Sequence, residues 1–118
     1  MSSGGFYPGD KGGIIVAPTT MGVDMSLASA DLGPFSEIVL ELHWSGANAV
    51  DATIDIQASV SGQYFESYKN ALYSMNAAYG THLWRVILGA VPYINIVFSH
   101  GTNTTGTFSV IYRRETPT

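Results

Sequence analysis

The stretch EIVLELHWSGANAVDATIDIQAS, residues 37–59, decides the fold class of this chain. In its first half every second residue is large and apolar, and the same alternation resumes after a short polar gap. A period of two is typical of β-strands that bury one face. The apolar set is Ile38, Leu40, Leu42, Trp44, Val50, Ala52, Ile54, Ile56 and Ala58. The stretch therefore predicts two strands, each with one apolar and one polar side.

The short gap between the two runs predicts that they pair as a hairpin. In that register Trp44 faces Val50 and Ile38 faces Ile56, so every large apolar group lies on one side. A slip of one residue would expose all of them, so this register is strongly favoured. The other side would carry Val39, Glu41, His43, Asp51, Thr53, Asp55 and Gln57.

The rest of the chain adds five short extended runs separated by turn signals such as Gly33-Pro34 and Ser61-Gly62. These runs lie at about 13–17, 23–28, 82–88, 92–99 and 105–114. Seven short strands at this spacing predict an all-β fold, an antiparallel β-sandwich or jelly roll. We expect inward-facing side chains on the later strands at Ile94, Ile96, Phe98, Phe108 and Val110.

The segment 63–81 leaves two interpretations open. Its large residues fall at helix-like spacing, which is consistent with one helix. Its asparagines, serines and tyrosines are equally consistent with a strand and long loops. The residues at helix-like spacing are Phe65, Tyr68, Leu72, Met75 and Tyr79.

The first 13 residues are rich in glycine and predict a flexible arm. We therefore divide the chain into an extended N-terminal arm with a first short strand, 1–22, and a β-sandwich domain, 23–118. The start does not resemble a signal peptide, because no basic segment precedes an apolar run. The longest apolar run, 86–98, is too short to span a bilayer. We expect a protein made in the cytoplasm that does not contact membranes.

Charge is unusually sparse. Only 12% of residues are Asp, Glu, Lys or Arg, against about 25% in typical soluble domains. A surface with few charges suits a protein covered by neighbouring subunits, because burying unpaired charge is costly; it also suits a low-charge secreted β-domain. The net charge is −4 and the five basic residues are dispersed, which argues against nucleic-acid binding. Cysteine is absent from the sequence, so disulfides and thiolate chemistry are excluded.

Ionisable groups concentrate at one place only, around His43, Glu41, Asp51 and Asp55. In the hairpin register His43 lies opposite Asp51. This arrangement could be a metal site or an acid–base pair, or a solvated sheet face with one cross-strand ion pair, and we favour the second interpretation. We therefore predict no catalytic, cofactor-binding or metal-binding residue and no enzyme activity. The glycosylation sequon at 103–105 is interpreted as a polar turn.

Aromatic residues could stack on sugar rings, or could serve the core and subunit contacts. The aromatics considered for sugar stacking are Tyr64, Phe65, Tyr68, Tyr73, Tyr79 and Trp84. We favour core and subunit contacts. The candidate interface residues are Phe6, Tyr7, Tyr64, Tyr68, Tyr73 and Tyr79.

Several short motifs between residues 23 and 114 follow one pattern. They are Asp24-Met25-Ser26, His43-Trp44-Ser45-Gly46, Gln57-Ala58-Ser59, Ser61-Gly62-Gln63-Tyr64-Phe65, Leu83-Trp84-Arg85, Tyr93-Ile94-Asn95-Ile96-Val97-Phe98 and Thr105-Gly106-Thr107-Phe108-Ser109-Val110. In this pattern the chain resembles small β-sandwich structural proteins of tailed bacteriophages. Two positions depart from the pattern, since Ser61 replaces a usual Asp and Asn95 replaces a usual Arg.

The resemblance implies a virion component without enzyme activity or cofactors. The main expectation is a capsid decoration (cement) protein, a homo-oligomer such as a trimer, that contacts the major capsid protein or other virion proteins. Its N-terminal arm would reach a neighbouring subunit. The alternative is a tail or fibre module that binds carbohydrate on the host surface.

Overall fold

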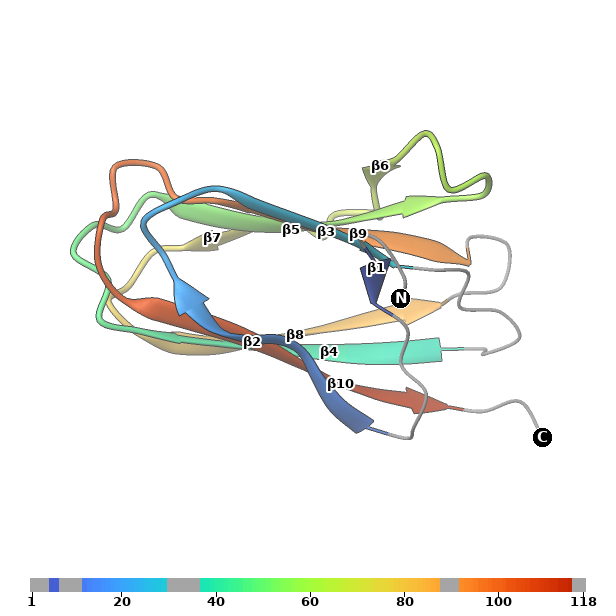
Figure 1. Cartoon of the computed structure of the whole chain (residues 1–118), viewed down its shortest axis with the longest axis horizontal. Helices are drawn as coiled ribbons and strands as arrows, with labels where there is room; N and C mark the ends of the chain where they lie inside the picture. Colours follow the sequence, from blue (N-terminus) through green and yellow to red (C-terminus); the bar gives the residue numbers. More distant parts are fainter. Residues whose placement is uncertain (1–4, 7–11, 30–36, 88–91, 116–118) are drawn as a thin grey trace.

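The computed structural model describes residues 5–6, 12–29, 37–87 and 92–115 (Figure 1). Within these ranges the chain forms ten strands and no helix, so no described segment is a helix that could cross a membrane. The strands are β1 (Gly5–Phe6), β2 (Gly12–Thr20), β3 (Met25–Ser29), β4 (Glu37–Ser45), β5 (Ala52–Ser59), β6 (Glu66–Ser67), β7 (Tyr73–Met75), β8 (Gly80–Ile87), β9 (Tyr93–Ser99) and β10 (Thr107–Glu115).

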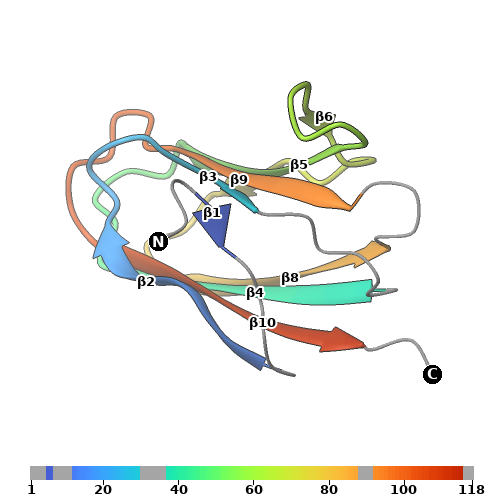
Figure 2. The same cartoon turned by 45° about the vertical axis from the view of Figure 1, so that its right-hand side comes forward.

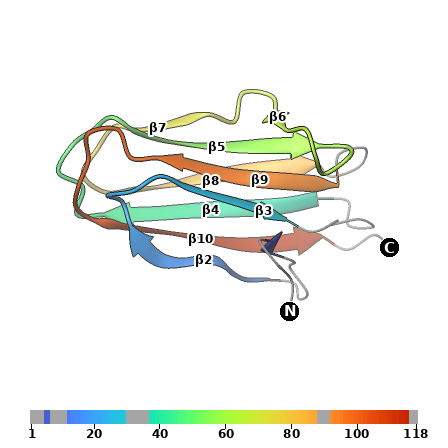
Figure 3. The ribbon, with the colours of Figure 1, turned by 45° about the horizontal axis from the view of Figure 1, so that its top comes forward.

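The strands form two sheets that lie face to face (Figures 1 and 2). One sheet has six strands in the order β1-β3-β9-β5-β6, with β7 also paired to β5, and the other has four in the order β2-β10-β4-β8. All pairings are antiparallel except the short β1–β3 pair. Figure 3 shows the strands of both sheets running in similar directions, as in aligned sandwich packing. The predicted antiparallel β-sandwich is confirmed, and the finer jelly-roll assignment stays a prediction.

The predicted hairpin between 37–44 and 50–59 is wrong. β4 pairs with β8 and β10 in the four-stranded sheet, whereas β5 pairs with β9, β6 and β7 in the other sheet. The connection after Ser45 crosses between the layers (Figure 1). The alternation predicts the strands and their buried sides correctly, but not their partners. Two strands that are each apolar on one side bury those sides equally well in a hairpin or in two sheets that face each other.

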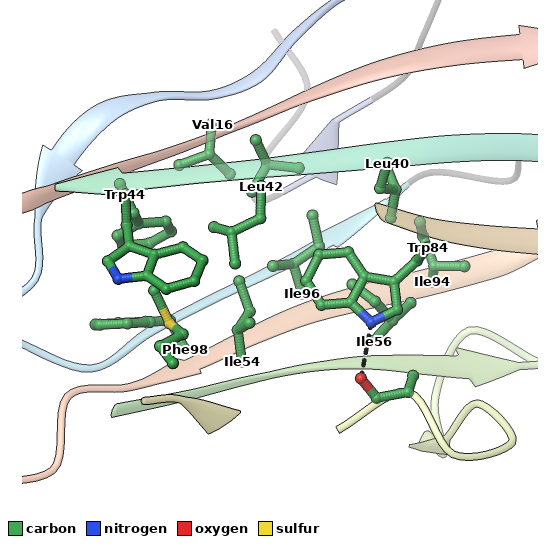
Figure 4. Close-up of a cluster of buried hydrophobic side chains, with 14 of the residues drawn as sticks. Val16, Leu40, Leu42, Trp44, Ile54, Ile56, Trp84, Ile94, Ile96 and Phe98 are labelled. Atoms are coloured by element: carbon green, nitrogen blue, oxygen red, sulfur yellow. Dashed lines mark hydrogen bonds between the residues drawn. The ribbon is translucent and has the colours of Figure 1, made fainter. Parts of the chain in front are cut away.

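The core lies between the sheets and contains the predicted inward-facing residues (Figure 4). Side chains from β4, β5 and β9 are almost fully enclosed, including Ile38, Leu40, Leu42, Ile54, Ile56, Ile94, Ile96 and Phe98. Phe98 stacks on Phe108 with ring centroids 4.4 Å apart, so the two sheets also meet through aromatic contact. Two members of the predicted apolar set lie outside the core: Val50 is exposed in the crossing connection, and Ala58 is only half-buried near the end of β5, where Ser59 is buried instead.

The ambiguous segment 63–81 contains no helix but two short strands, β6 and β7, joined by turns. Two tryptophans of the four-stranded sheet hold it in place. Trp44 Nε1 donates to the Ala77 carbonyl at 3.0 Å, and Trp84 Nε1 donates to the Ala71 carbonyl at 2.7 Å. The Trp44 ring also lies against Gly80, where an added Cβ would approach it to 2.5 Å. The segment therefore closes one open side of the sandwich.

The predicted division at residue 22 places β2 with the arm, but residues 12–20 are an integral edge strand of the four-stranded sheet. Val16 and Met21 are buried in the core. The pairing of β2 with β10 shifts register twice, with Pro18 at one of the irregular positions. Bulges and proline are typical of edge strands, since they discourage pairing with another chain. Residues 1–4 and 7–11 of the predicted arm lie outside the described residues.

Asn103 holds together the end of the sandwich where four connections meet. Its side chain is fully buried, and its Oδ1 accepts hydrogen bonds from the amides of Asn48 and Ala49 at 2.7 and 3.1 Å. Its Nδ2 donates to the carbonyls of Met21 and Thr105 at 3.0 and 2.6 Å. The sequon asparagine thus lies in a turn, as predicted, but its amide is a buried structural connection between three segments and is not accessible to a glycan.

We predict that Asn103→Ala lowers the free energy of unfolding by about 3 kcal/mol or more, because each buried backbone group left without a partner costs about 1–3 kcal/mol. Urea denaturation of the full chain measures this change. The matched control is Asn76→Ala at an exposed site, expected to change stability by less than about 0.5 kcal/mol. Equal effects of the two substitutions would contradict the role assigned to Asn103.

Candidate functional site

The outer faces of the two sheets differ in chemistry. Polar side chains form a hydrogen-bonded row across β3, β9 and β5 on the six-stranded sheet. Ser26 Oγ donates to Asn95 Oδ1 at 3.1 Å, and Asn95 Nδ2 donates to Gln57 Oε1 at 3.2 Å. Asp55, next along β5, accepts a hydrogen bond from Ser67. This face satisfies its own polar groups and is suited to contact with water.

Apolar side chains collect on the outer face of the four-stranded sheet. Ile14, Leu83 and Ile87 are 65%, 58% and 46% exposed, and Val39 and Ile111 beside them are half-buried. The register places Ile14 beside Ile111, and Glu41 between Ile111 and Leu83. We call these five apolar residues, Ile14, Val39, Leu83, Ile87 and Ile111, the apolar face. A hollow of about 290 Å³ lies within it, lined in part by Val39, Leu83 and Ile111.

Charged groups alternate with the apolar side chains on this face. Glu41 lies between Ile111 and Leu83, and Val39 lies between Arg113 and Arg85. Arg85 Nη1 pairs with Glu37 Oε2, and Glu41 and Arg113 line the hollow together with the apolar side chains. Apolar area interspersed with charged groups is a composition that protein contact surfaces share. The sequence indicates this face, because β8 and β10 carry large apolar residues on both of their alternating sides. Leu83, Ile87 and Ile111 lie on the side that faces outward. Our sequence analysis, centred on the tyrosines, missed it.

A second hollow, of about 470 Å³, lies at one end of the same outer face. It crosses all four strands, from Pro18 on β2 to the segment Tyr79–Thr81 at the start of β8. Its other lining residues come from the adjoining ends of β4 and β10 and are His43, Trp44, Ser45, Thr107, Phe108 and Ser109. We call this hollow the trough. Within the described chain, its lining includes no Asp, Glu, Lys or Arg side chain.

His43 lies in the trough and is held from both sides of its ring. Its Nε2 is 3.1 Å from Glu41 Oε1, and its Nδ1 is 3.2 Å from Thr81 Oγ1. A carboxylate only accepts hydrogen bonds, so Nε2 carries the hydrogen, and Nδ1 of the neutral ring accepts from the Thr81 hydroxyl. The predicted pairing of His43 with Asp51 is therefore wrong, since Asp51 belongs to the other sheet and the partners of His43 are Glu41 and Thr81.

The chain of contacts from Glu41 through His43 to Thr81 has the order of a hydrolase triad. The same contacts arise from ordinary neighbour positions, since Glu41 and His43 are two residues apart on β4 and Thr81 is directly opposite His43 on β8. The side chains of His43 and Glu41 are 48% and 34% exposed, so water screens their interaction. We interpret the contacts as fixing the orientation of the ring and of the Thr81 hydroxyl.

Asp51 lies at the end of the sandwich and not on a sheet face. Its carboxylate accepts hydrogen bonds from the hydroxyl and the amide of Thr102, at 2.8 and 3.0 Å. These bonds hold the pKa of Asp51 below its ordinary value of 3.8. His100 lies nearby. Among the described residues, no three His, Cys, Asp or Glu side chains come close enough together to bind a metal ion.

The candidate interface tyrosines separate into two kinds. Tyr64 and Tyr79 are 81% and 73% exposed and are available for contact. Tyr68 and Tyr73 pack against the core, and the Tyr68 hydroxyl accepts a hydrogen bond from the Ile87 amide at 3.0 Å. Of the two N-terminal candidates, Phe6 pairs through its backbone with β3, and Tyr7 lies outside the described residues.

His82 fills the space between aromatic rings at the edge of the core. It stacks on Tyr73 with ring centroids 3.8 Å apart, and it meets Trp84 edge to face at 4.8 Å. Burial lowers the pKa of His82 below its ordinary value of 6.5, because a partly buried imidazolium loses hydration. The folded state therefore favours the neutral ring.

No protein-family model matches the chain, and neither does any curated protein sequence. The two surface features that its four-stranded sheet offers to a partner are the apolar face and the trough.

We predict that acid destabilises the protein partly through His82. The unfolded chain takes up a proton on this ring near the ordinary pKa of 6.5, and the folded chain does so only at lower pH. The stability that this neutral ring supports is intact above pH 6.5. It is lost as the pH falls through the pKa of His82 in the folded protein. Urea unfolding at about pH 7.5 and about pH 5.5 should show a smaller acid loss for His82→Phe than for the parent. An identical loss in both proteins would contradict this assignment.

Proposed function

We propose that the protein is a non-enzymatic structural component of a tailed-phage virion and acts as a capsid decoration, or cement, protein. The proposal joins two arguments. The first is the resemblance of its motifs to small phage β-sandwich proteins, and the second is the apolar face. Its partner is the major capsid protein or another virion protein, and its place of action is the assembled particle.

The apolar face is the single observation that carries this proposal. Exposed apolar side chains gathered on one face mark surfaces that contact other proteins. Ile14 and Leu83 are more than half exposed, although the same strands bury Val16 and Val86 in the core. The polar row on the six-stranded sheet is the contrasting surface, and it would remain in contact with water.

The mechanism is burial of area on a surface that exists only after assembly. Each exposed Leu or Ile that becomes fully buried contributes about 1.5–3 kcal/mol. A protein that binds the assembled shell and not its separated subunits raises the free energy of opening the shell. Two of the charges on this face already have a partner, since Arg85 pairs with Glu37, which reduces the cost of removing water from the contact.

We predict that Leu83→Lys weakens binding to empty shells of the phage that encodes the protein by about tenfold or more, because it removes the apolar Leu83 side chain from the contact. Occupancy is measured by co-sedimentation of the full chain with the shells. Leu83 is 58% exposed, so the variant should retain its fold, and thermal unfolding checks this.

The matched control is Val60→Lys, which introduces the same charge at a residue that is 70% exposed and follows β5 in the other sheet. Val60→Lys should bind shells as the parent does. If both variants bind as the parent does, the apolar face is not the contact surface. If the parent itself does not bind shells, the proposed decoration role is rejected.

A further inference from the structure

The trough is bordered at its two ends by rigid apolar groups. Tyr79 stands at the β8 edge of the sheet with 73% of its surface exposed, and exposed Pro18 stands at the β2 edge. A volume of about 470 Å³ lies within the range of small-molecule sites, about 300–1,000 Å³. The exposed face of the Tyr79 ring is an apolar plane of the kind that packs against flat ligand rings.

Hydroxyl groups line the floor between these borders. The register places Ser109, His43 and Thr81 in one row across three strands, and Thr107 beside Ser45 in the next row. Each Ser or Thr hydroxyl can donate one hydrogen bond and accept others. Within the described residues, no hydrogen bond involves the hydroxyl of Ser45, Thr107 or Ser109, so these three hydroxyls remain available to a ligand.

The contacts of His43 determine what the Thr81 hydroxyl offers. When the His43 ring is neutral with its hydrogen on Nε2, the Thr81 hydroxyl donates to Nδ1, and its oxygen is left to accept a hydrogen bond from a ligand. The floor therefore presents an oriented acceptor at Thr81 and freely rotating donor–acceptor groups at Ser45, Thr107 and Ser109. A ligand that both donates and accepts through several hydroxyls matches this surface.

The strand ends around the trough are fixed to one another. The amide of Met21, after β2, donates to the Gly106 carbonyl, before β10, at 3.0 Å. The Ala47 amide, after β4, donates to the carbonyl of Ala78, the residue that precedes Tyr79, at 3.1 Å. The backbone from which Tyr79 projects is therefore fixed before a ligand arrives, which lowers the ordering cost of binding.

We propose that the trough is a binding site for an uncharged saccharide. Tyr79 stacks on the apolar face of one sugar ring, and the hydroxyls of Ser45, Thr81, Thr107 and Ser109 exchange hydrogen bonds with the sugar hydroxyls. The lack of Lys, Arg, Asp and Glu in the described lining favours a neutral ligand over a phosphorylated or acidic one, because the lining offers no Lys or Arg to pair with an anion. The trough adjoins the apolar face on the same side of the sheet, since His43 contacts Glu41, which lines the hollow of that face.

The test is titration of the isotope-labelled full chain with neutral oligosaccharides of glucose, mannose and galactose, followed by amide chemical shifts in NMR spectra. Hyaluronan oligosaccharide serves as the acidic probe. We expect at least one neutral probe to bind, with shift changes centred on Ser45, Thr81 and Ser109, and the acidic probe to bind more weakly. The proposal is rejected if all neutral probes leave these amides unchanged at about 10 mM, a concentration that detects even millimolar affinity.

Variants then separate ring stacking from a general loss of structure. Tyr79→Ala should weaken binding about five- to tenfold, and Tyr79→Phe should retain it, because the ring and not the hydroxyl makes the stacking contact. Thr81→Val should weaken binding about fivefold through loss of one hydrogen-bond acceptor. The matched control is Tyr64→Ala, which removes an equally exposed tyrosine that does not line the trough.

Tyr64→Ala should bind as the parent does, and amide spectra of all four variants report whether the fold is retained. Undiminished binding by Tyr79→Ala would overturn the proposal, and so would equal weakening by Tyr64→Ala and Tyr79→Ala. Shell binding by the same variants provides the comparison with the apolar face. Loss of sugar binding with normal shell occupancy would show that the two surfaces act separately.

Discussion

The structure depends on burying the apolar sides of β4 and β5 against each other. Leu40 and Leu42 from one sheet and Ile54 and Ile56 from the other are fully enclosed. Neither strand can bury its apolar side alone, and a sandwich of two one-sided sheets is the solution that leaves both polar sides in water. The other strands add width to each layer, and the remaining features of the molecule are positioned by this contact.

Once the core is filled, the chain still places large apolar residues on one outer surface. Leu83 and Ile87 point outward from β8, whose inward phase supplies Trp84 and Val86 to the core. A strand that is apolar on both sides needs cover on both. The six-stranded sheet carries Asn95 and its hydrogen-bonded neighbours at the equivalent outer positions. This asymmetry distinguishes the two faces of the sandwich and gives the molecule one surface suited to contact with another protein.

The sequence predicted the strands and their inward phase well, because period-two alternation is a local property of each strand. It could not predict which strands pair. Ile38 and Ile56 have the same burial whether their strands form a hairpin or face each other, so the partner is decided by the whole set of strands. For the same reason the site was missed. His43 meets Thr81, which is 38 residues away, and no local pattern indicates that contact. Asn103 was interpreted as a polar turn, and its burial follows from the three chain segments that meet around it.

The end of the sandwich that contains Asn103 explains how a shallow polar surface can be specific. Backbone groups of the connections around the trough bond to Asn103 or to one another, as the Ala47–Ala78 and Met21–Gly106 pairs do. The Trp44 indole adds a bond to the Ala77 carbonyl, two residues before Tyr79. Hydrogen bonds to water and to a ligand have similar strength, so an open site gains affinity mainly when its groups need no reordering. The buried amide and indole supply that rigidity from beneath the surface. The sheet supplies the spacing of the hydroxyls, and the connections hold the aromatic ring beside them.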